Sequence, residues 1–171
     1  MVRNINNRWI NLLVVFIWLC ILAPVSAAKL EMADRVLIKK SERKLFLMKK
    51  DRILKSVNIS LGLVPKGDKL SEGDFRTPEG SYKLTDRNPA SDFFLSILIS
   101  YPNGVDNHEA ERLGLSPGGQ IMIHGQPNDP SHSPDYYLWT DWTDGCIAVS
   151  NSNMVDIWLM TDNNTPIDIL P

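Results

Sequence analysis

Cysteine and positive charge are both scarce in this sequence. Cys20 and Cys146 are the only cysteines among 171 residues, which excludes a small scaffold held together by several disulfides. The formal net charge at pH 7 is −2, so the chain has no surplus of lysine and arginine with which to neutralise the phosphates of a nucleic acid. We therefore expect no nucleic-acid partner.

Metal-binding motifs and internal repeats are absent as well. The sequence contains no Cys-x-x-Cys and no His-Glu-x-x-His, and we therefore expect no metal site. His108 and His132 are interpreted as surface residues. No linker or low-complexity segment divides the chain, and 43% of apolar residues is typical of a folded protein. One domain with one core is the simplest organisation.

The first 28 residues have the pattern of a secretory signal peptide. Residues 1–11 are polar and carry two arginines, residues 12–22 form an unbroken apolar run, and small residues at 26–28 follow Pro24. This order predicts export to the periplasm or cell envelope, and cleavage before a mature domain of residues 29–171. The net charge of that domain is near −4, because both arginines are lost.

An uncleaved membrane anchor is the alternative interpretation of this segment. The apolar run is short for a span of about 20 residues, so we expect contact with the membrane only transiently, through the signal peptide. Lipidation of Cys20 is not expected, because Leu19 stands where bacterial lipoprotein signals have a small residue. Cys146 is then the only cysteine of the mature domain and has no internal disulfide partner.

Short apolar runs separated by turn residues predict many short strands. Apolar and polar residues alternate in several of these runs, as in half-buried strands. Charged turns between the first runs favour antiparallel hairpins. The predicted strands are residues 35–39, 44–49, 53–61, 82–84, 94–101, 120–124 and 165–170.

Helices are predicted to be few and short. They are expected at residues 108–113 and 153–160. Ser150 or Asn151 is the predicted N-cap of the second helix, because a short side-chain oxygen there accepts from unpaired N–H groups. Glycine and proline predict loops or connections at residues 62–80, 88–93 and 126–143.

One histidine and one cysteine stand at the ends of predicted local structures. His124 ends a predicted strand, and Cys146 follows an Asp-Gly turn. A buried structural cysteine is the commonest interpretation of an isolated thiol, but an unpaired thiol in an oxidising compartment is a liability unless it has a use. A neighbouring imidazole lowers the pKa of a thiol and so favours the nucleophilic thiolate. We therefore predict that Cys146 is a nucleophile and that His124 is its base, which would also protonate a leaving amine.

Backbone groups beside Cys146 are predicted to complete this site. Glycine permits a tight turn in which successive N–H groups point to one place. The N–H groups of Gly145 and Cys146 are therefore predicted to form an oxyanion hole.

The segments around these residues follow a pattern found in one enzyme family. Eighteen residues lie between His124, which is followed by Gly125, and the segment Thr143-Asp144-Gly145-Cys146. Thr77-Pro78-Glu79-Gly80 lies upstream within residues 73–82. These segments resemble the catalytic histidine, the Ser/Thr-His-Gly-Cys motif and the Thr-Pro-x-Gly element of the L,D-transpeptidase catalytic domain, also called the YkuD domain. Together with the first predicted strands, the resemblance covers about residues 34–170.

The resemblance implies a fold and a reaction. The fold would be mainly β (α+β), a β-sandwich of mixed sheets with a few short helices. Family members attack an L-centre to D-centre amide in the stem peptides of peptidoglycan and form a thioester on the cysteine, here Cys146. The acyl group then passes to the amine of a second stem, to the lysine of a wall-tethered protein, or to water. His124 would be the base, and the carbonyl of Gly125 would orient its ring.

The resemblance also implies what such an enzyme requires. Family members need no metal or organic cofactor, and carbapenems commonly acylate their cysteine. We therefore expect no cofactor, a monomeric chain, and a role in cell-wall cross-linking or remodelling and thus in cell shape.

Three features depart from the family pattern. Asp144 replaces the second histidine, Ala148 replaces an arginine or asparagine, and the gap before Thr143 is slightly long. The sequence Asp-Gly-Cys-Ile-Ala resembles a divergent branch that includes YafK-like proteins. Because we assign the altered residues to substrate positioning, an L,D-amidohydrolase or carboxypeptidase is an alternative function. An inactive peptidoglycan-binding module is a second alternative, although binding alone would not require both Cys146 and His124.

Residues next to Cys146 are candidates for substrate binding. Asp144 could contact substrate, orient His124 as in a Cys-His-Asp triad, or serve only as a turn residue. Thr143 could contact substrate or hydrogen-bond within its loop. Aromatic residues of the same loop could line a groove or simply pack it; they are Tyr136, Tyr137, Trp139 and Trp142.

Three polar residues farther along the chain are further candidates. Arg76 could contact a substrate carboxylate or pair with Asp74 or Glu79. Gln126 and Asn128 follow the predicted base closely and could bind peptide amides.

Overall fold

The computed structural model describes residues 30–171. The predicted signal peptide lies outside this range and stays a prediction. Within the range, no helix has the length and apolar character needed to cross a membrane.

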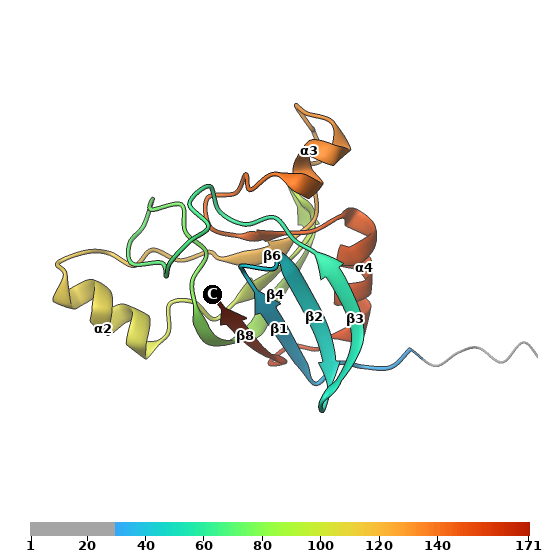
Figure 1. The fold of residues 1–171 in the computed structure, drawn as a ribbon, viewed down its shortest axis with the longest axis horizontal. Coiled ribbons are helices and arrows are strands. Elements are labelled where there is room, and N and C mark those ends of the chain that lie inside the picture. Colours follow the sequence, from blue (N-terminus) through green and yellow to red (C-terminus); the bar gives the residue numbers. More distant parts are fainter. Residues whose placement is uncertain (1–29) are drawn as a thin grey trace, which may run out of the picture.

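The first part of the sheet is an antiparallel meander (Figure 1). It consists of β1 (Arg35–Lys39), β2 (Lys44–Lys49) and β3 (Arg52–Asn58). Side chains of β1 alternate between partly buried and buried, and Val36 and Ile38 are fully buried. This is the two-residue period of a strand with one face on the core. The first two predicted strands are confirmed with their bounds, and the third ends earlier than expected.

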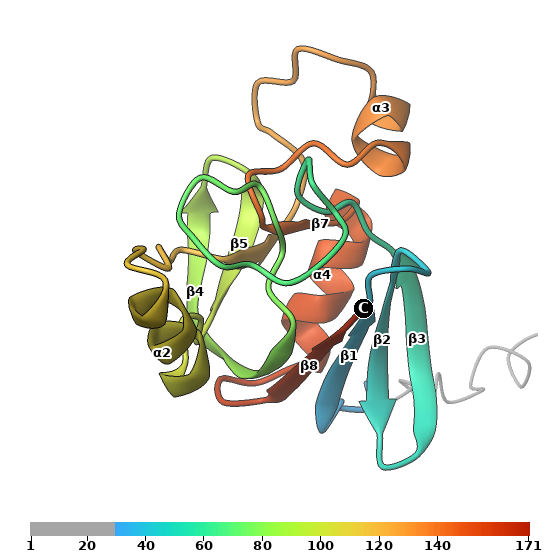
Figure 2. The same cartoon turned by 60° about the vertical axis from the view of Figure 1, so that its left-hand side comes forward.

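The last strand of the chain lies in the middle of the sheet. The strands of the described residues form one mixed sheet in the order β3-β2-β1-β8-β4-β5-β6-β7. β8 (Pro166–Leu170) is parallel to β1 and antiparallel to the start of β4 (Gly80–Ser91). The later residues of β4 pair with β5 (Phe94–Ile99), so β4 joins the two parts of the sheet (Figure 2). A mainly β fold with mixed strand directions and a few short helices is confirmed, and its parts form one continuous sheet.

The second part of the sheet carries the predicted catalytic residues. β5 pairs with β6 (Met122–His124), which is parallel to β7 (Ile147–Ala148). α4 (Asn151–Met160) packs against β5 and buries Met154 and Ile157 in the same core as the strands. Ser150, one of the two predicted N-caps, is confirmed because its hydroxyl accepts the Asn153 N–H at 3.2 Å. The helix begins two residues before the predicted start at residue 153.

Two predictions of local structure need correction here. Residues 88–93, expected to be a connection, belong largely to β4, because irregular pairing with β5 lets the strand continue to Ser91. α2 (Gly104–Arg112) begins earlier than the helix predicted at 108–113. The side chain of Asn103 caps its first turn, and this cap supplies the hydrogen-bond acceptors that an earlier start requires.

The loop predicted at 126–143 was also wrong in part. It contains α3 (Pro134–Trp139), which projects from the body of the molecule in both views (Figures 1 and 2). Pro134 stands in the first helical turn, where its missing N–H costs nothing. The Ser133-Pro134 pair was the signal that would have indicated a helix start.

Candidate active site

β6 and β7 bring the predicted base and nucleophile to one face of the sheet. The two strands are parallel, with Ile123 opposite Ile147 and His124 opposite Ala148. Side chains alternate along a strand, so His124 and Cys146, which directly precedes β7, share the face opposite to the two isoleucines. Both line one pocket of about 190 Å³. The other residues that line it are Phe93, Met122, Trp142, Thr143 and Asp144.

His124 is held as a buried, neutral ring. Its side chain is only 2% exposed, and Nδ1 lies 2.7 Å from the carbonyl oxygen of Gly125. A carbonyl can only accept, so Nδ1 donates its proton and Nε2 is the unprotonated nitrogen. Burial lowers the pKa of His124 to about 4, although the hydrogen bond to Gly125 acts in the opposite direction. At pH 7 the ring is therefore neutral, which is the form that a general base requires.

Two aromatic side chains enclose this ring. The centroid of Phe93 lies 4.6 Å from that of His124, and Trp142 meets His124 edge-on at 5.5 Å. The Trp142 indole also donates to the carbonyl of Tyr137 at 3.1 Å, so this tryptophan both packs its loop and lines the pocket. Phe93 was missed in the sequence, because its position at the β4–β5 turn had been interpreted as a simple connection.

Cys146 is partly exposed at the floor of the same pocket. Its thiol donates to the carbonyl of Gln120 at 3.6 Å. Burial raises the pKa of the Cys146 thiol and the charge of Asp144 adds to this effect, whereas the Met122 N–H and the charge of Lys69 oppose it. The free protein therefore holds a thiol beside a neutral imidazole rather than a thiolate–imidazolium pair.

Thr143 organises the turn that presents Cys146. Its side chain is 4% exposed, and Oγ1 donates to the carbonyl of Cys146 at 2.7 Å. The same oxygen accepts the N–H of Gly145 at 3.2 Å. The Gly145 N–H, predicted as an oxyanion donor, is therefore already engaged inside the turn, and Thr143 has a structural task. The Cys146 N–H stays a predicted oxyanion donor.

Gly145 is required at its position for two reasons. Its φ is +129°, a conformation that side chains other than glycine rarely adopt. A Cβ at this residue would lie 2.6 Å from the carbonyl oxygen of Arg76. The segment around Arg76 therefore packs directly against the nucleophile turn.

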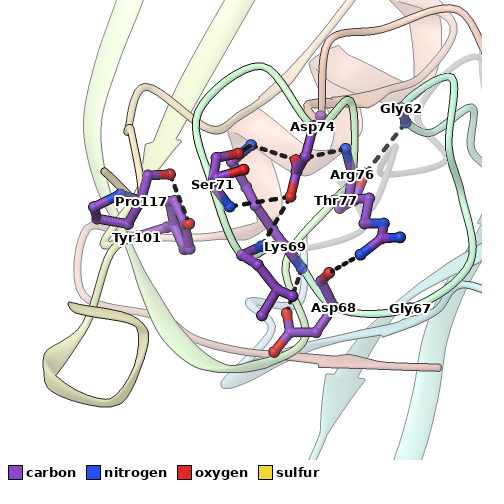
Figure 3. Close-up of polar contacts among 12 residues, drawn as sticks. Gly62, Gly67, Asp68, Lys69, Ser71, Asp74, Arg76, Thr77, Tyr101 and Pro117 are labelled. Atoms are coloured by element: carbon purple, nitrogen blue, oxygen red, sulfur yellow. Dashed lines mark hydrogen bonds and ion pairs between the residues drawn. The ribbon is translucent and has the colours of Figure 1, made fainter. Parts of the chain in front are cut away.

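A partly buried carboxylate, that of Asp74, organises the backbone of that segment (Figure 3). Asp74 accepts the Lys69 ammonium at 2.8 Å and the backbone N–H groups of Leu70, Ser71 and Arg76 at 2.8, 3.2 and 3.0 Å. Burial alone would raise the pKa of Asp74, but these donors outweigh it and lower the pKa. Lys69 is 5% exposed, so the pair fixes the loop from within and leaves a positive charge near Cys146.

For the Arg76 guanidinium, contact with a substrate carboxylate stays a prediction, and the alternative, an ion pair, was wrong. It forms no salt bridge with Asp74 or Glu79 in the described chain; Glu79 pairs with Lys40 at 2.8 Å. Nη1 instead donates to the carbonyl of Asp68 at 3.3 Å (Figure 3). Arg76 is also not among the residues that line the pocket of Cys146.

Two other predicted substrate-binding residues, Asp144 and Asn128, differ in whether they line the pocket of Cys146. Asp144 is exposed at the rim of the pocket, but His124 uses Gly125 rather than Asp144 as its Nδ1 partner. The Asn128 amide accepts the Phe94 N–H at 3.0 Å and donates to the carbonyl of Ser91 at 2.8 Å, so it braces the β4–β5 turn.

Gln126 is likewise occupied within the protein. Its side chain donates to the carbonyl of Pro134 at 3.4 Å, and its backbone N–H donates to Asn151 Oδ1 at 2.8 Å. Gln126 and Asn128 are both absent from the pocket lining. Among residues 30–171, no group of three His, Cys, Asp or Glu side chains is arranged to hold a metal ion.

Comparison with solved structures finds similar folds, among them those of a cell shape determining protein and an L,D-transpeptidase. The helical cell shape determining protein Pgp2 from Campylobacter jejuni is 29% identical, with a TM-score of 0.59, over 78% of this chain and 46% of that chain. Bd1075 from Bdellovibrio bacteriovorus is 24% identical, with a TM-score of 0.55, over 82% and 51%. An L,D-transpeptidase from Mycobacterium smegmatis has the same fold at 12% identity, with a TM-score of 0.52, over 80% and 58%. The chain thus spans about half the length of these solved proteins.

Comparison with sequence families gives the assignment. No curated protein matches this chain. The family model of the L,D-transpeptidase catalytic domain matches residues 33–169, which is almost the whole of the described chain. The protein therefore belongs to the L,D-transpeptidase catalytic domain (YkuD) family.

Proposed function

We propose that this protein is an exported L,D-transpeptidase that acts on peptidoglycan stem peptides through a thioester on Cys146. The observation that carries the proposal is the shared pocket of His124 and Cys146, in which the Nδ1–H of His124 is held by Gly125 and Nε2 is left as a base. Family membership supplies the reaction class. The resemblance to Pgp2, a cell shape determining protein, supports a role in the cell wall.

The first half-reaction follows from the protonation states of the free protein. Nε2 of His124 removes the thiol proton of Cys146 while the sulfur attacks the carbonyl carbon of the L,D-amide. The Cys146 N–H stabilises the oxygen of the tetrahedral intermediate. The imidazolium then gives its proton to the leaving amine, the C–N bond breaks, and the thioester remains.

The second half-reaction reverses these roles. An acceptor amine enters the pocket, Nε2 takes one of its protons, and the nitrogen attacks the thioester carbon. The thiolate leaves and regains its proton from the imidazolium. Water in place of the amine would give hydrolysis by the same steps.

Asp144 supports transfer to an amine. Its carboxylate is exposed at the rim of the pocket, where it attracts the ammonium form of an incoming acceptor. The usual family histidine would not supply this negative charge. We infer that the substitution changes acceptor selection and leaves the base unchanged.

Product analysis tests the proposal. Protein from Lys29 onward is incubated with muropeptides, with Cys146→Ala as the control, and the products are identified by mass spectrometry. Dimers with loss of a terminal D-residue are expected from the wild-type protein and not from the variant. Shortened stems without dimers would assign the protein to the amidohydrolases.

Carbapenem acylation tests Cys146 without the native substrate. Intact-mass measurement should show one adduct on the wild-type protein and none on Cys146→Ala. A wild-type protein that forms neither adduct nor product would leave only a peptidoglycan-binding role.

A further inference from the structure

A second and larger hollow lies outside the pocket of Cys146. It has a volume of about 680 Å³, within the range of small-molecule and oligomer sites. We call it the Trp139 groove and define it by Lys40, Arg43, Lys66, Glu79, Trp139 and Asp141. Beyond Arg43 and Asp141, a smaller hollow of about 150 Å³ continues along the other side of Trp139. The two hollows share Arg43, Trp139 and Asp141 in their linings, so they are adjacent and Trp139 contributes to both.

Trp139 is presented to solvent rather than packed. Its side chain is 73% exposed, whereas Tyr137 of the same helix is only 6% exposed. Within residues 30–171 the indole N–H of Trp139 makes no hydrogen bond, while that of Trp142 donates to Tyr137. Exposing a tryptophan forgoes a large hydrophobic gain, and exposed aromatics in a hollow are typical of binding surfaces. α3, which carries Trp139, projects from the body in Figures 1 and 2.

Four charged residues of the groove are held in two pairs, and Lys66, which is exposed, forms no ion pair within residues 30–171. Lys40 is 1% exposed, and its ammonium contacts Glu79 at 2.8 Å and two backbone carbonyls, those of Gly67 at 2.7 Å and Thr77 at 2.8 Å. These contacts hold the Lys40 side chain, which lines the groove, in one position.

The second pair lies beside the tryptophan. Arg43 contacts Asp141 with Nε at 3.1 Å and Nη2 at 2.7 Å, and Asp141 also accepts the Leu61 N–H at 2.9 Å. Because each cation is balanced by a carboxylate, these four groove residues carry no net charge. With Lys66, the six residues that define the groove carry one net positive charge. The paired residues offer fixed donors and acceptors to a ligand with many hydroxyl or amide groups.

One short segment connects the groove to the catalytic pocket. Trp139 and Asp141 line the groove, and Trp142, the next residue, lines the pocket of His124 and Cys146. The backbone N–H of Trp142 donates to the carbonyl of Leu61 at 3.1 Å, which fixes this segment to the body. A ligand with two arms could therefore occupy both hollows at once.

We propose that the Trp139 groove binds the glycan strand to which the stem peptides are attached. Trp139 stacks on the C–H face of an N-acetylated sugar ring, and the Arg43–Asp141 pair exchanges hydrogen bonds with hydroxyl and acetamide groups. The choice of this glycan rests on the proposed function. The groove chemistry by itself favours a ligand that is rich in hydroxyl and amide groups and can stack on Trp139.

Binding of a peptide-free sugar tests the groove without any turnover. Chitohexaose is titrated into Cys146→Ala protein by calorimetry. Adding Trp139→Ala should weaken binding at least about tenfold, and Trp139→Phe should restore most of it because an aromatic face remains. Leu159→Ala is the matched control, since Leu159 is also exposed, at 53%, but lies on α4.

A turnover comparison tests the link between the two hollows. Trp139→Ala should lower the rate on intact sacculi by about tenfold and lower the rate on free muropeptides, which carry only one disaccharide, by a smaller factor.

Four outcomes would overturn the glycan proposal: no binding of chitohexaose, equal binding by Trp139→Ala, equal loss of rate on both substrates, or Trp139-dependent binding of a sugar-free stem peptide. A wild-type protein that binds chitohexaose through Trp139 but turns over no muropeptide would refute the proposed activity alone.

Discussion

The pocket of His124 and Cys146 and the Trp139 groove differ in whether their ionisable side chains carry charge. In the pocket, burial lowers the pKa of His124 to about 4 and raises the pKa of Cys146, so both reacting groups are uncharged before substrate arrives. In the groove, Arg43 and Lys40 are held as ion pairs with Asp141 and Glu79. This difference fits the proposed roles, in which one site moves a proton and the other presents fixed polar groups. Changes to one site should therefore leave the other intact.

Loss of the base should have the largest effect, and it should affect the pocket of Cys146 and not the groove. His124→Ala should slow acylation by a carbapenem by about a hundredfold or more, because general-base catalysis contributes ~10²–10⁴. Binding of chitohexaose should not change. Intact-mass kinetics give the rate, and a urea melt shows whether the variant is folded. Acylation at the wild-type rate would mean that another base acts.

Substitution of the turn glycine should damage the pocket through the backbone. Gly145→Ala would place a side chain at φ +129° and 2.6 Å from the Arg76 carbonyl. We expect a loss of about 3 to 5 kcal/mol in the free energy of unfolding, measured by urea denaturation.

Gly119→Ala is the matched control for that glycine. A Cβ at Gly119 would meet no atom within 4 Å, so its denaturation curve should follow that of the wild type. Equal stability of both variants would contradict the close packing of the residue 74–77 segment on the turn.

Acid should weaken the fold through His124. In the folded protein the pKa of His124 lies at about 4, below its ordinary value of 6.5, so between these values the unfolded chain binds one more proton than the folded chain. The free energy of unfolding should therefore fall as the pH drops from 6.5 to 4, by roughly 3 kcal/mol in total. Urea melts across this range measure the slope. His124→Gln should reduce it, and identical slopes would show that His124 is not the group responsible.

The smallest effect is expected at Asp144, on the rim of the pocket of Cys146. Asp144→Asn removes a negative charge from an exposed position, and rim charges change association by small factors. We expect the KM for the acceptor amine to rise about two- to threefold. The rate of carbapenem acylation should change by no more than a similar factor. Asp135→Asn, at an exposed position on α3, is the control. An unchanged KM would show that Asp144 is only a turn residue.

Much of the fold could be predicted because the decisive signals are local. Alternation in residues 35–49 gave the first hairpin with its bounds, and Ser150 gave the start of α4. β4 could not be predicted in full. Its extension through residues 88–91 depends on pairing with β5, so the sequence of that segment does not by itself contain the cause.

The candidate site was predictable in part for the same reason. His124, Cys146 and Gly145 stand in recognisable motifs, and their spacing suggested one site. Phe93 contacts His124 only because the β4–β5 turn folds back onto β6. Arg76 and Asn128 were assigned to substrate from residue type alone, but tertiary contacts engage both inside the protein.

The sequence by itself determined the family, the mainly β character and the residues capable of nucleophilic chemistry, since these depend on residue type and on spacing along the chain. Only the tertiary structure decided the protonation state of that chemistry. The pKa of His124 depends on burial and on one carbonyl, and the occupation of the Gly145 N–H depends on the direction of one hydroxyl. The exposure of Trp139 beside two ion pairs is equally a result of packing. Burial, exposure and the direction of hydrogen bonds are all set only when segments that are distant in the sequence pack together.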